Sequence, residues 1–128
     1  MSVLSSITLL SPPRIHFGAG CADAALAALV GTRHRKVFLV TSPSVLVHAN
    51  AIAGKLCAAR VSVEIAMGVP PEPTMACCEK LRAQAAVFAP DLVLAVGGGS
   101  VLDVAKIVAA LHDRAEPASN FYGINVLD

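Results

Sequence analysis

The chain has 128 residues, a formal net charge of +1, 55% hydrophobic residues and only 15% charged residues. This length fits one domain, residues 1–128, and the near-neutral charge with 4% aromatic residues argues against nucleic acid as a partner. No apolar run approaches the roughly 18 residues of a membrane span, and the first residues do not form a secretory signal. We therefore expect no membrane association and a cytoplasmic location.

Strand and helix patterns alternate along the chain, separated by glycine and proline. We expect strands over residues 7–10, 14–17, 36–41, 61–66 and 92–96, and helices over residues 22–30, 45–59, 75–88 and from 101 to about 112. Ser44 is the expected N-cap of the second helix. Residues 116–120 should form a loop. The first helix should bury one face, made of Ala25, Leu26 and Leu29.

This alternation predicts an α/β domain with a mainly parallel sheet and helices on both faces. The strand at residues 36–41 is apolar through its middle, which indicates a central position. Ligands of such sheets bind beyond the carboxyl ends of the strands. Three loops follow those ends, at residues 42–44, 68–74 and 97–100, and we expect them to meet at one crevice.

The cysteines and histidines show no pattern of ligands or disulfides. The four cysteines contain no Cys-x-x-Cys pair, and the four histidines show no i, i+4 spacing. Reduced thiols, typical of cytoplasmic proteins, are the expected state. We expect no metal site built from this chain alone.

Three glycines, Gly97, Gly98 and Gly99, join the strand at 92–96 to the following helix. Glycines can adopt conformations closed to other residues and they expose their N–H groups, and a helix start adds unpaired N–H groups and partial positive charge. The segment therefore predicts an anion site, most often for phosphate; a purely structural tight turn is the alternative. Neither the P-loop nor the usual dinucleotide fingerprint fits, because Leu102 stands where the fingerprint requires its third glycine.

The residues after these glycines allow a structural interpretation too. Ser100 and Asp103 have the spacing of a capping box, and Lys106 is placed to pair with Asp103. On spacing alone, these three residues would stabilise the helix without any part in function.

The ten residues from Gly97 to Lys106, Gly-Gly-Gly-Ser-Val-Leu-Asp-Val-Ala-Lys, resemble the glycine-rich signature of the iron-containing alcohol dehydrogenases. Residues 15–20 resemble the opening strand and turn of that family, and residues 69–74 its proline loop. All three occur in the family's order, so the resemblance covers nearly the whole chain. It implies a nucleotide-binding domain of modified Rossmann type, followed in the family by an all-helical metal domain that this chain lacks.

The resemblance also implies a cofactor, NAD or NADP, and a set of residues near it. The glycine loop of the family holds the pyrophosphate, which assigns this role to Gly97, Gly98, Gly99 and Ser100. Asp103 and Lys106 match positions close to the cofactor and the active cleft. Ser42 would border the adenosine ribose, where many members that use NAD carry an aspartate. A hydroxyl there brings no charge to repel the extra phosphate of NADP, so we expect NADP to be accepted.

The implied reaction is hydride transfer between an alcohol and its aldehyde or ketone, in a full-length enzyme that is a homo-oligomer. The family's divalent metal, iron or zinc, is bound by residues beyond Asp128, so this chain alone is expected to be inactive. Glycerol dehydrogenases and maleylacetate reductases look similar over this region. A stand-alone or truncated nucleotide-binding module without catalysis is the remaining alternative.

Overall fold

The computed structural model describes residues 11–121, so the strand expected at residues 7–10 lies outside the described residues. Three strands alternate with helices, as predicted. In chain order the elements are α1 (Cys21–Val30), β1 (Lys36–Thr41), the 3-10 helix η1 (Pro43–Val45), α2 (Leu46–Ala58), β2 (Ser62–Ala66), α3 (Met75–Phe88), β3 (Leu92–Val96), α4 (Gly99–Leu111) and the 3-10 helix η2 (Ala118–Phe121). None of the helices in this part of the chain has the length and apolarity needed to cross a membrane.

The three strands form one parallel sheet in the order β2-β1-β3. The expectation of a central strand at residues 36–41 is confirmed, since β1 lies between the other two. Its residues after Lys36 are all buried. The register places Thr41, the last residue of β1, beside Val96, the last residue of β3. The two strands therefore end level with each other.

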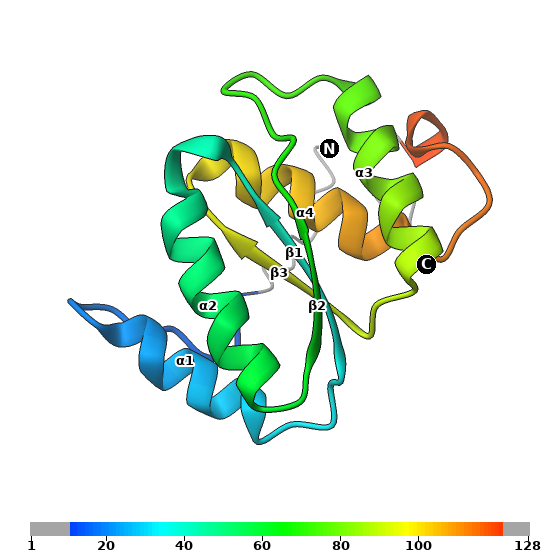
Figure 1. The fold of residues 1–128 in the computed structure, drawn as a ribbon. Helices are drawn as coiled ribbons and strands as arrows, with labels where there is room; N and C mark the ends of the chain where they lie inside the picture. Colours follow the sequence, from blue (N-terminus) through cyan, green and yellow to red (C-terminus); the bar gives the residue numbers. More distant parts are fainter. Residues whose placement is uncertain (1–10, 122–128) are drawn as a thin grey trace, which may run out of the picture.

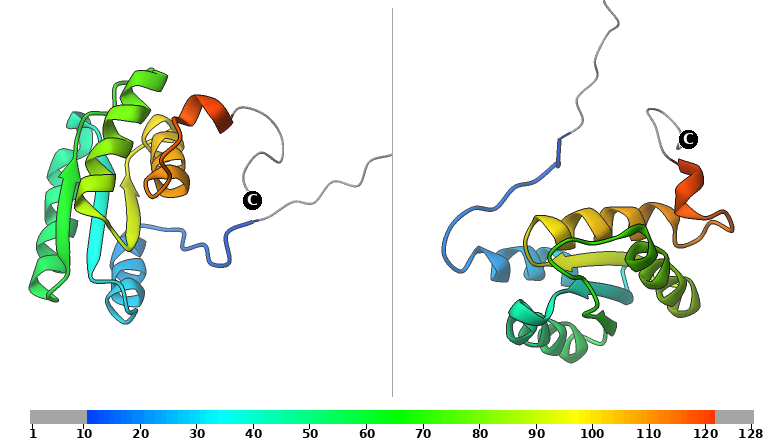
Figure 2. Two further views of the ribbon diagram at one scale, coloured as in Figure 1. Left: turned by 90° about the vertical axis from the view of Figure 1, so that its right-hand side faces the viewer. Right: turned by 90° about the horizontal axis from the view of Figure 1, so that it is seen from above.

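Helices cover both faces of the sheet (Figures 1 and 2). Phe38 and Val40 point to one face, where they pack with side chains of α3 and α4. Val37 and Leu39 point to the other face, against α1 and α2. The side chains of β1 thus supply both halves of the core, as alternation along a strand requires. The α/β class predicted from the sequence is confirmed.

After the neighbouring strands β1 and β3, the chain crosses to opposite faces of the sheet. From β1 it turns into α2, on one face of the sheet, and from β3 it turns into α4, on the other face. Such a reversal is a topological switch point, and it leaves a crevice between the ends of the two strands. The fold therefore opens a site where β1 and β3 end.

Several local expectations were wrong. Residues 14–17 form no strand; no neighbouring strand pairs with them in the described chain, and Ile15 and Phe17 are 77% and 100% exposed. Alternation alone cannot supply a pairing partner. Ala25 is exposed, while Leu26 is the buried residue of α1. The expected loop at 116–120 contains η2.

Candidate functional site

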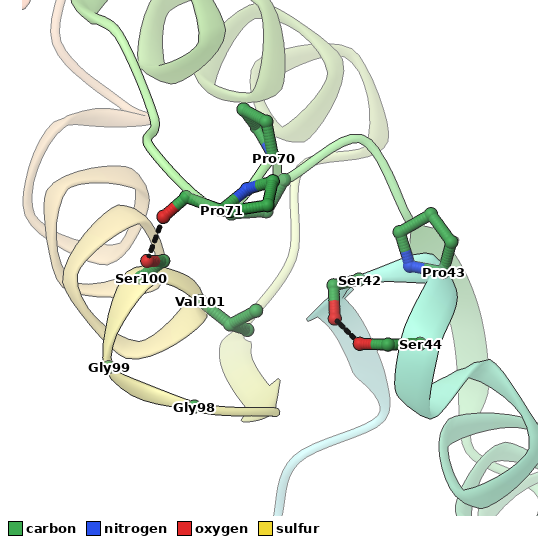
Figure 3. A pocket seen from close by; sticks show the side chains of 10 residues that line it. Ser42, Pro43, Ser44, Pro70, Pro71, Gly98, Gly99, Ser100 and Val101 are labelled. Carbon is green, nitrogen blue, oxygen red and sulfur yellow. Dashed lines mark hydrogen bonds between the residues drawn. The ribbon is translucent and has the colours of Figure 1, made fainter.

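The three loops at the carboxyl ends of the strands meet at one crevice, as predicted (Figure 3). Its volume is about 420 Å³. The lining comes from the end of β1, the loop after β2 and the start of α4, and consists of Ser42, Pro43, Ser44, Val69, Pro70, Pro71, Gly98, Gly99, Ser100 and Val101. None of these side chains carries a charge. Any attraction that the lining exerts on an anion must therefore come from backbone dipoles and hydroxyl groups.

The glycine turn (residues 97–99) does not use the conformational freedom of glycine. None of its three residues has a positive φ; in residues 11–121 only Gly18 and Gly20 do among the glycines. Gly98, for example, is extended, with φ −83° and ψ −169°. Conformations closed to other residues are therefore not the reason for glycine at these three positions.

Gly97 is required by packing. A Cβ at this position would lie 2.6 Å from Cγ2 and 2.8 Å from Cβ of Val101. Val101 is 3% exposed and branched at Cβ, so it has little freedom to move away. The first turn of α4 thus folds directly onto the end of β3.

Packing does not require glycine at positions 98 and 99. A Cβ built on either residue would meet nothing within 4 Å. Both residues line the crevice, and α4 begins at Gly99 without a side-chain cap. The N–H groups of its first turn therefore lack a partner within the helix and lie at the positive end of the helix dipole. An anion can approach this backbone because no side chain stands in front of it.

Ser100 bridges two walls of the crevice. Its Oγ donates a hydrogen bond of 2.6 Å to the carbonyl oxygen of Pro71, in the proline loop (residues 69–74). The capping box with Asp103 is absent, because Gly98 is the N-cap of α4 and Ser100 is already its second residue. The predicted pair of Asp103 and Lys106 is present, at 3.3 Å, with both side chains about three-quarters exposed (73% and 76%). Neither residue lines the crevice.

The other wall carries two serines. The Oγ atoms of Ser42 and Ser44 lie 2.9 Å apart, in hydrogen-bond contact (Figure 3). Ser44 is not the N-cap of α2, which starts after Val45 without a side-chain cap. Of the predicted site residues, the structure thus brings Ser42, Gly98, Gly99 and Ser100 to the crevice. Gly97 lines a separate hollow, together with side chains of α1 and α2.

Thr41 supports the crevice from below its lining, directly before Ser42, and the sequence interpretation missed it. It is fully buried, and its Oγ1 donates a 2.8 Å hydrogen bond to the carbonyl oxygen of Val96, directly before Gly97. The available signal was a threonine at the end of an otherwise apolar strand. Pro71 lies in a loop that was expected at the crevice, but its hydrogen bond with Ser100, 29 positions away, was missed. The close contact of Val101 with Gly97 was missed as well.

The titratable groups with shifted pKa values lie away from the crevice. Burial raises the pKa of the Cys78 thiol. The backbone N–H of Ala118 lowers the pKa of Glu79, and that of Arg35 lowers the pKa of Asp91. In residues 11–121 no group of three or more histidine, cysteine or acidic side chains could hold a metal ion. The crevice therefore offers binding groups and no acid, base or metal ligand.

Comparison with known proteins identifies the family. Residues 12–127 match the model of the family described as iron-containing alcohol dehydrogenase. The chain belongs to this family. The match includes the glycine turn, the proline loop and Ser42, so the resemblance found in the sequence is confirmed.

Relatives in this family are longer proteins. The chain is 38% identical over 89 residues to an alcohol dehydrogenase of Thermococcus barophilus, covering 68% of this chain and 24% of that protein. It is 32% identical over 107 residues to the bifunctional aldehyde-alcohol dehydrogenase of Escherichia coli K12, covering 82% of this chain and 12% of the relative. A long-chain-alcohol dehydrogenase of Geobacillus thermodenitrificans is 32% identical over 114 residues, with 86% and 29% covered. The chain thus spans less than a third of each relative.

A solved structure shows the same fold. The chain superposes on an archaeal halo-thermophilic alcohol dehydrogenase from a Red Sea brine pool with a TM-score of 0.66 and 22% identity. The superposition covers 75% of this chain and 26% of the other. At this identity the likeness supports the Rossmann-like architecture alone.

Proposed function

We propose that the crevice binds the pyrophosphate of NAD or NADP, and that this domain is the cofactor-binding part of a metal-dependent alcohol dehydrogenase. The observation that carries the proposal is the bare backbone at Gly98 and Gly99. Packing accounts for the glycine at position 97, but nothing in the fold demands one at 98 or 99. Glycines at these two positions keep the start of α4 accessible to a ligand.

The chemistry of the crevice fits a phosphate group held by backbone. Unpaired N–H groups at the start of a 13-residue helix favour an anion. The crevice has no charged lining residue that would repel or compete with a phosphate. Asp103 and Lys106, which lie about one and two turns further along α4, would influence the cofactor from outside the crevice lining.

Ser42 and Ser44 would border the adenosine ribose, since they line the wall opposite the glycine turn. Their hydroxyl groups can accept or donate hydrogen bonds to the ribose, and they add no negative charge. The extra phosphate of NADP would meet no repulsion there. We therefore propose that NADP is accepted as well as NAD.

The reaction belongs to the full-length protein. Its proposed course is hydride transfer between a small alcohol and the nicotinamide ring, giving an aldehyde or ketone. A bound divalent metal, iron or zinc, supplies Lewis-acid polarisation of the substrate oxygen. Residues 11–121 contain no candidate metal cluster, and in this proposal they supply the cofactor site. A homo-oligomeric assembly in the cytoplasm is part of the same proposal.

Titration of the full-length protein with NADH and NADPH, followed by nicotinamide fluorescence, tests the proposal. Gly98→Ala and Gly99→Ala should each weaken binding about tenfold or more, because the methyl group occupies the path of the phosphate. The melting temperature without cofactor should stay within about 2 °C of the wild type, since the methyl meets no protein atom.

Two results would contradict the proposal. Wild-type protein that binds neither cofactor at millimolar concentration has no dinucleotide site. Alanine variants that bind as tightly as the wild type would show that the bare backbone has no part in binding. A tenfold preference for NADH over NADPH would contradict only the assignment of Ser42.

A further inference from the structure

Thr41 is the one polar or charged residue within residues 11–121 that is buried. Every other core position of β1 is apolar, and Val37, Phe38, Leu39 and Val40 are all fully buried. A buried hydroxyl costs free energy unless it finds a hydrogen-bond partner. Thr41 finds one across the sheet, in the carbonyl oxygen of Val96 at 2.8 Å. The hydroxyl thus joins the ends of the two strands that border the crevice.

This carbonyl group belongs to the peptide bond that starts the glycine turn. The C=O of Val96 and the N–H of Gly97 lie in one planar trans peptide and point in opposite directions. A hydrogen bond that fixes the carbonyl oxygen therefore fixes the orientation of the whole peptide plane. The side chain of Val101, in the first turn of α4, lies so close to Gly97 that a Cβ there would come within 2.6 Å of its Cγ2.

The turn is therefore held between two contacts, one polar and one apolar. Thr41 fixes its first peptide from β1, and Val101 fixes its first residue from α4. The N–H groups of Gly98, Gly99 and Ser100 follow within three residues, so a rotation at Val96 would move them. Their direction decides whether they can converge on one anion.

We infer that Thr41 is a positioning residue of the cofactor site: its hydroxyl orients the Val96–Gly97 peptide and thereby sets the donors of the glycine turn for the pyrophosphate. This inference rests on the proposed function. Thr41 does not line the crevice and touches no cofactor atom in this scheme; it acts through Val96. It also ties the turn to Ser42, its neighbour in sequence, so that both walls of the crevice share one anchor.

Two substitutions separate the hydroxyl from the packing. Thr41→Val keeps the branched shape and removes the hydroxyl, and valine is a residue that suits an apolar strand. Thr41→Ser keeps the hydroxyl and removes a methyl group from a fully buried site. Both variants are made in the full-length protein. Binding of NADH and NADPH is measured by fluorescence titration, the melting temperature is measured without cofactor, and the Gly97 amide is followed by ¹⁵N NMR.

The two variants should affect cofactor affinity and melting temperature in opposite ways. Thr41→Val should weaken binding five- to tenfold and shift the Gly97 amide resonance without cofactor, while its melting temperature stays near the wild type. Thr41→Ser should bind within twofold of the wild type, although its melting temperature falls. A Thr41→Val variant with wild-type affinity would overturn the inference. So would a Thr41→Ser variant that loses as much affinity as Thr41→Val, because packing would then be the cause.

The outcome also separates this inference from the proposed function. If the wild type binds neither NADH nor NADPH, the proposed function fails and the positioning role for a cofactor fails with it. If the wild type binds and Gly98→Ala does not, while Thr41→Val binds normally, only the role of Thr41 is overturned.

Discussion

The hydroxyl of Ser100 donates to the carbonyl oxygen of Pro71 across 29 positions of sequence, at 2.6 Å. This bond connects the first turn of α4 to the proline loop and closes one side of the crevice (Figure 3). A hydroxyl has one proton to donate, and phosphate oxygens only accept. While the bond to Pro71 is made, the Ser100 hydroxyl cannot also donate to a bound phosphate, so Ser100 could contribute only its backbone N–H group.

Loss of this bond should loosen the proline loop. Three of its residues are prolines, so the amide hydrogens that report on it include those of Glu72 and Thr74. In Ser100→Ala we expect larger nanosecond motions of the backbone at Glu72 and Thr74, measured as lower ¹⁵N heteronuclear NOE values, and a loss of unfolding free energy of about 1 kcal/mol or less. Ser44→Ala, on the opposite wall, is the matched control and should leave the NOE values in the loop unchanged. Equal NOE values in Ser100→Ala and wild type would mean that the bond does not hold the loop.

Gly97→Ala should destabilise the protein, in contrast to Gly98→Ala. The added methyl would approach Val101 Cγ2 to 2.6 Å, and overpacking of this kind costs about 1–3 kcal/mol. In Gly97→Ala/Val101→Ala the methyl has room, so the loss should be smaller than the sum of the two single losses. Urea unfolding of the wild type and the three variants gives the coupling. Strictly additive losses of unfolding free energy would show that the contact with Val101 is not the reason why position 97 requires glycine.

The sequence was sufficient for features that depend on neighbouring residues. The helix at residues 75–88 and the strands at 36–41 and 92–96 begin and end as predicted, because an apolar pattern is bounded there by proline or glycine. Their order then required a parallel sheet and brought three loops together. The crevice was predictable for that reason.

The hydrogen-bond partners of the hydroxyl groups were not predicted, and those of Ser100 and Thr41 are distant in sequence. Ser100 has the spacing of a capping box, but Pro71 offers its carbonyl oxygen and takes the hydrogen bond. Ser44 pairs with Ser42 and leaves α2 without a cap. Thr41 bonds Val96 on a strand that only the folded sheet places beside it. Spacing within a segment contains no information about such partners.

Ala89 provides a test of backbone strain outside the site. It follows α3 in the left-handed region, with φ 52° and ψ 64°, a conformation that costs a residue with a Cβ about 1 kcal/mol or more. Ala89→Gly should therefore raise the unfolding free energy by about 0.5–1 kcal/mol, since glycine adopts this conformation freely. Ala83→Gly, at an exposed position inside α3, is the control and should lower it by a similar amount. A lower unfolding free energy in Ala89→Gly would show that the backbone of Ala89 is not strained.

Glu79 anchors the segment after α4 to α3. Its carboxylate accepts from the backbone N–H of Ala118 and from Arg82, whose Nε and one terminal nitrogen each lie 2.9 Å from Oε2. Arg82 also donates to the carbonyl oxygen of Arg114 at 2.8 Å. The segment leading to η2 is thus held by one acidic and one basic side chain of α3.

These contacts make stability depend on pH. The N–H of Ala118, and after it Arg82, lower the pKa of Glu79 in the folded protein. The ionised carboxylate therefore stabilises the fold above its unfolded pKa of about 4.3, and this contribution is lost as the pH falls through the folded value. Glu79→Gln should have a lower melting temperature than the wild type at pH 7, and the difference should shrink below about pH 4. Glu72→Gln, at an exposed glutamate of the proline loop, controls for the loss of one carboxylate. A difference for Glu79→Gln that stays constant from pH 7 to pH 3 would show that the carboxylate's charge has no part in the anchor.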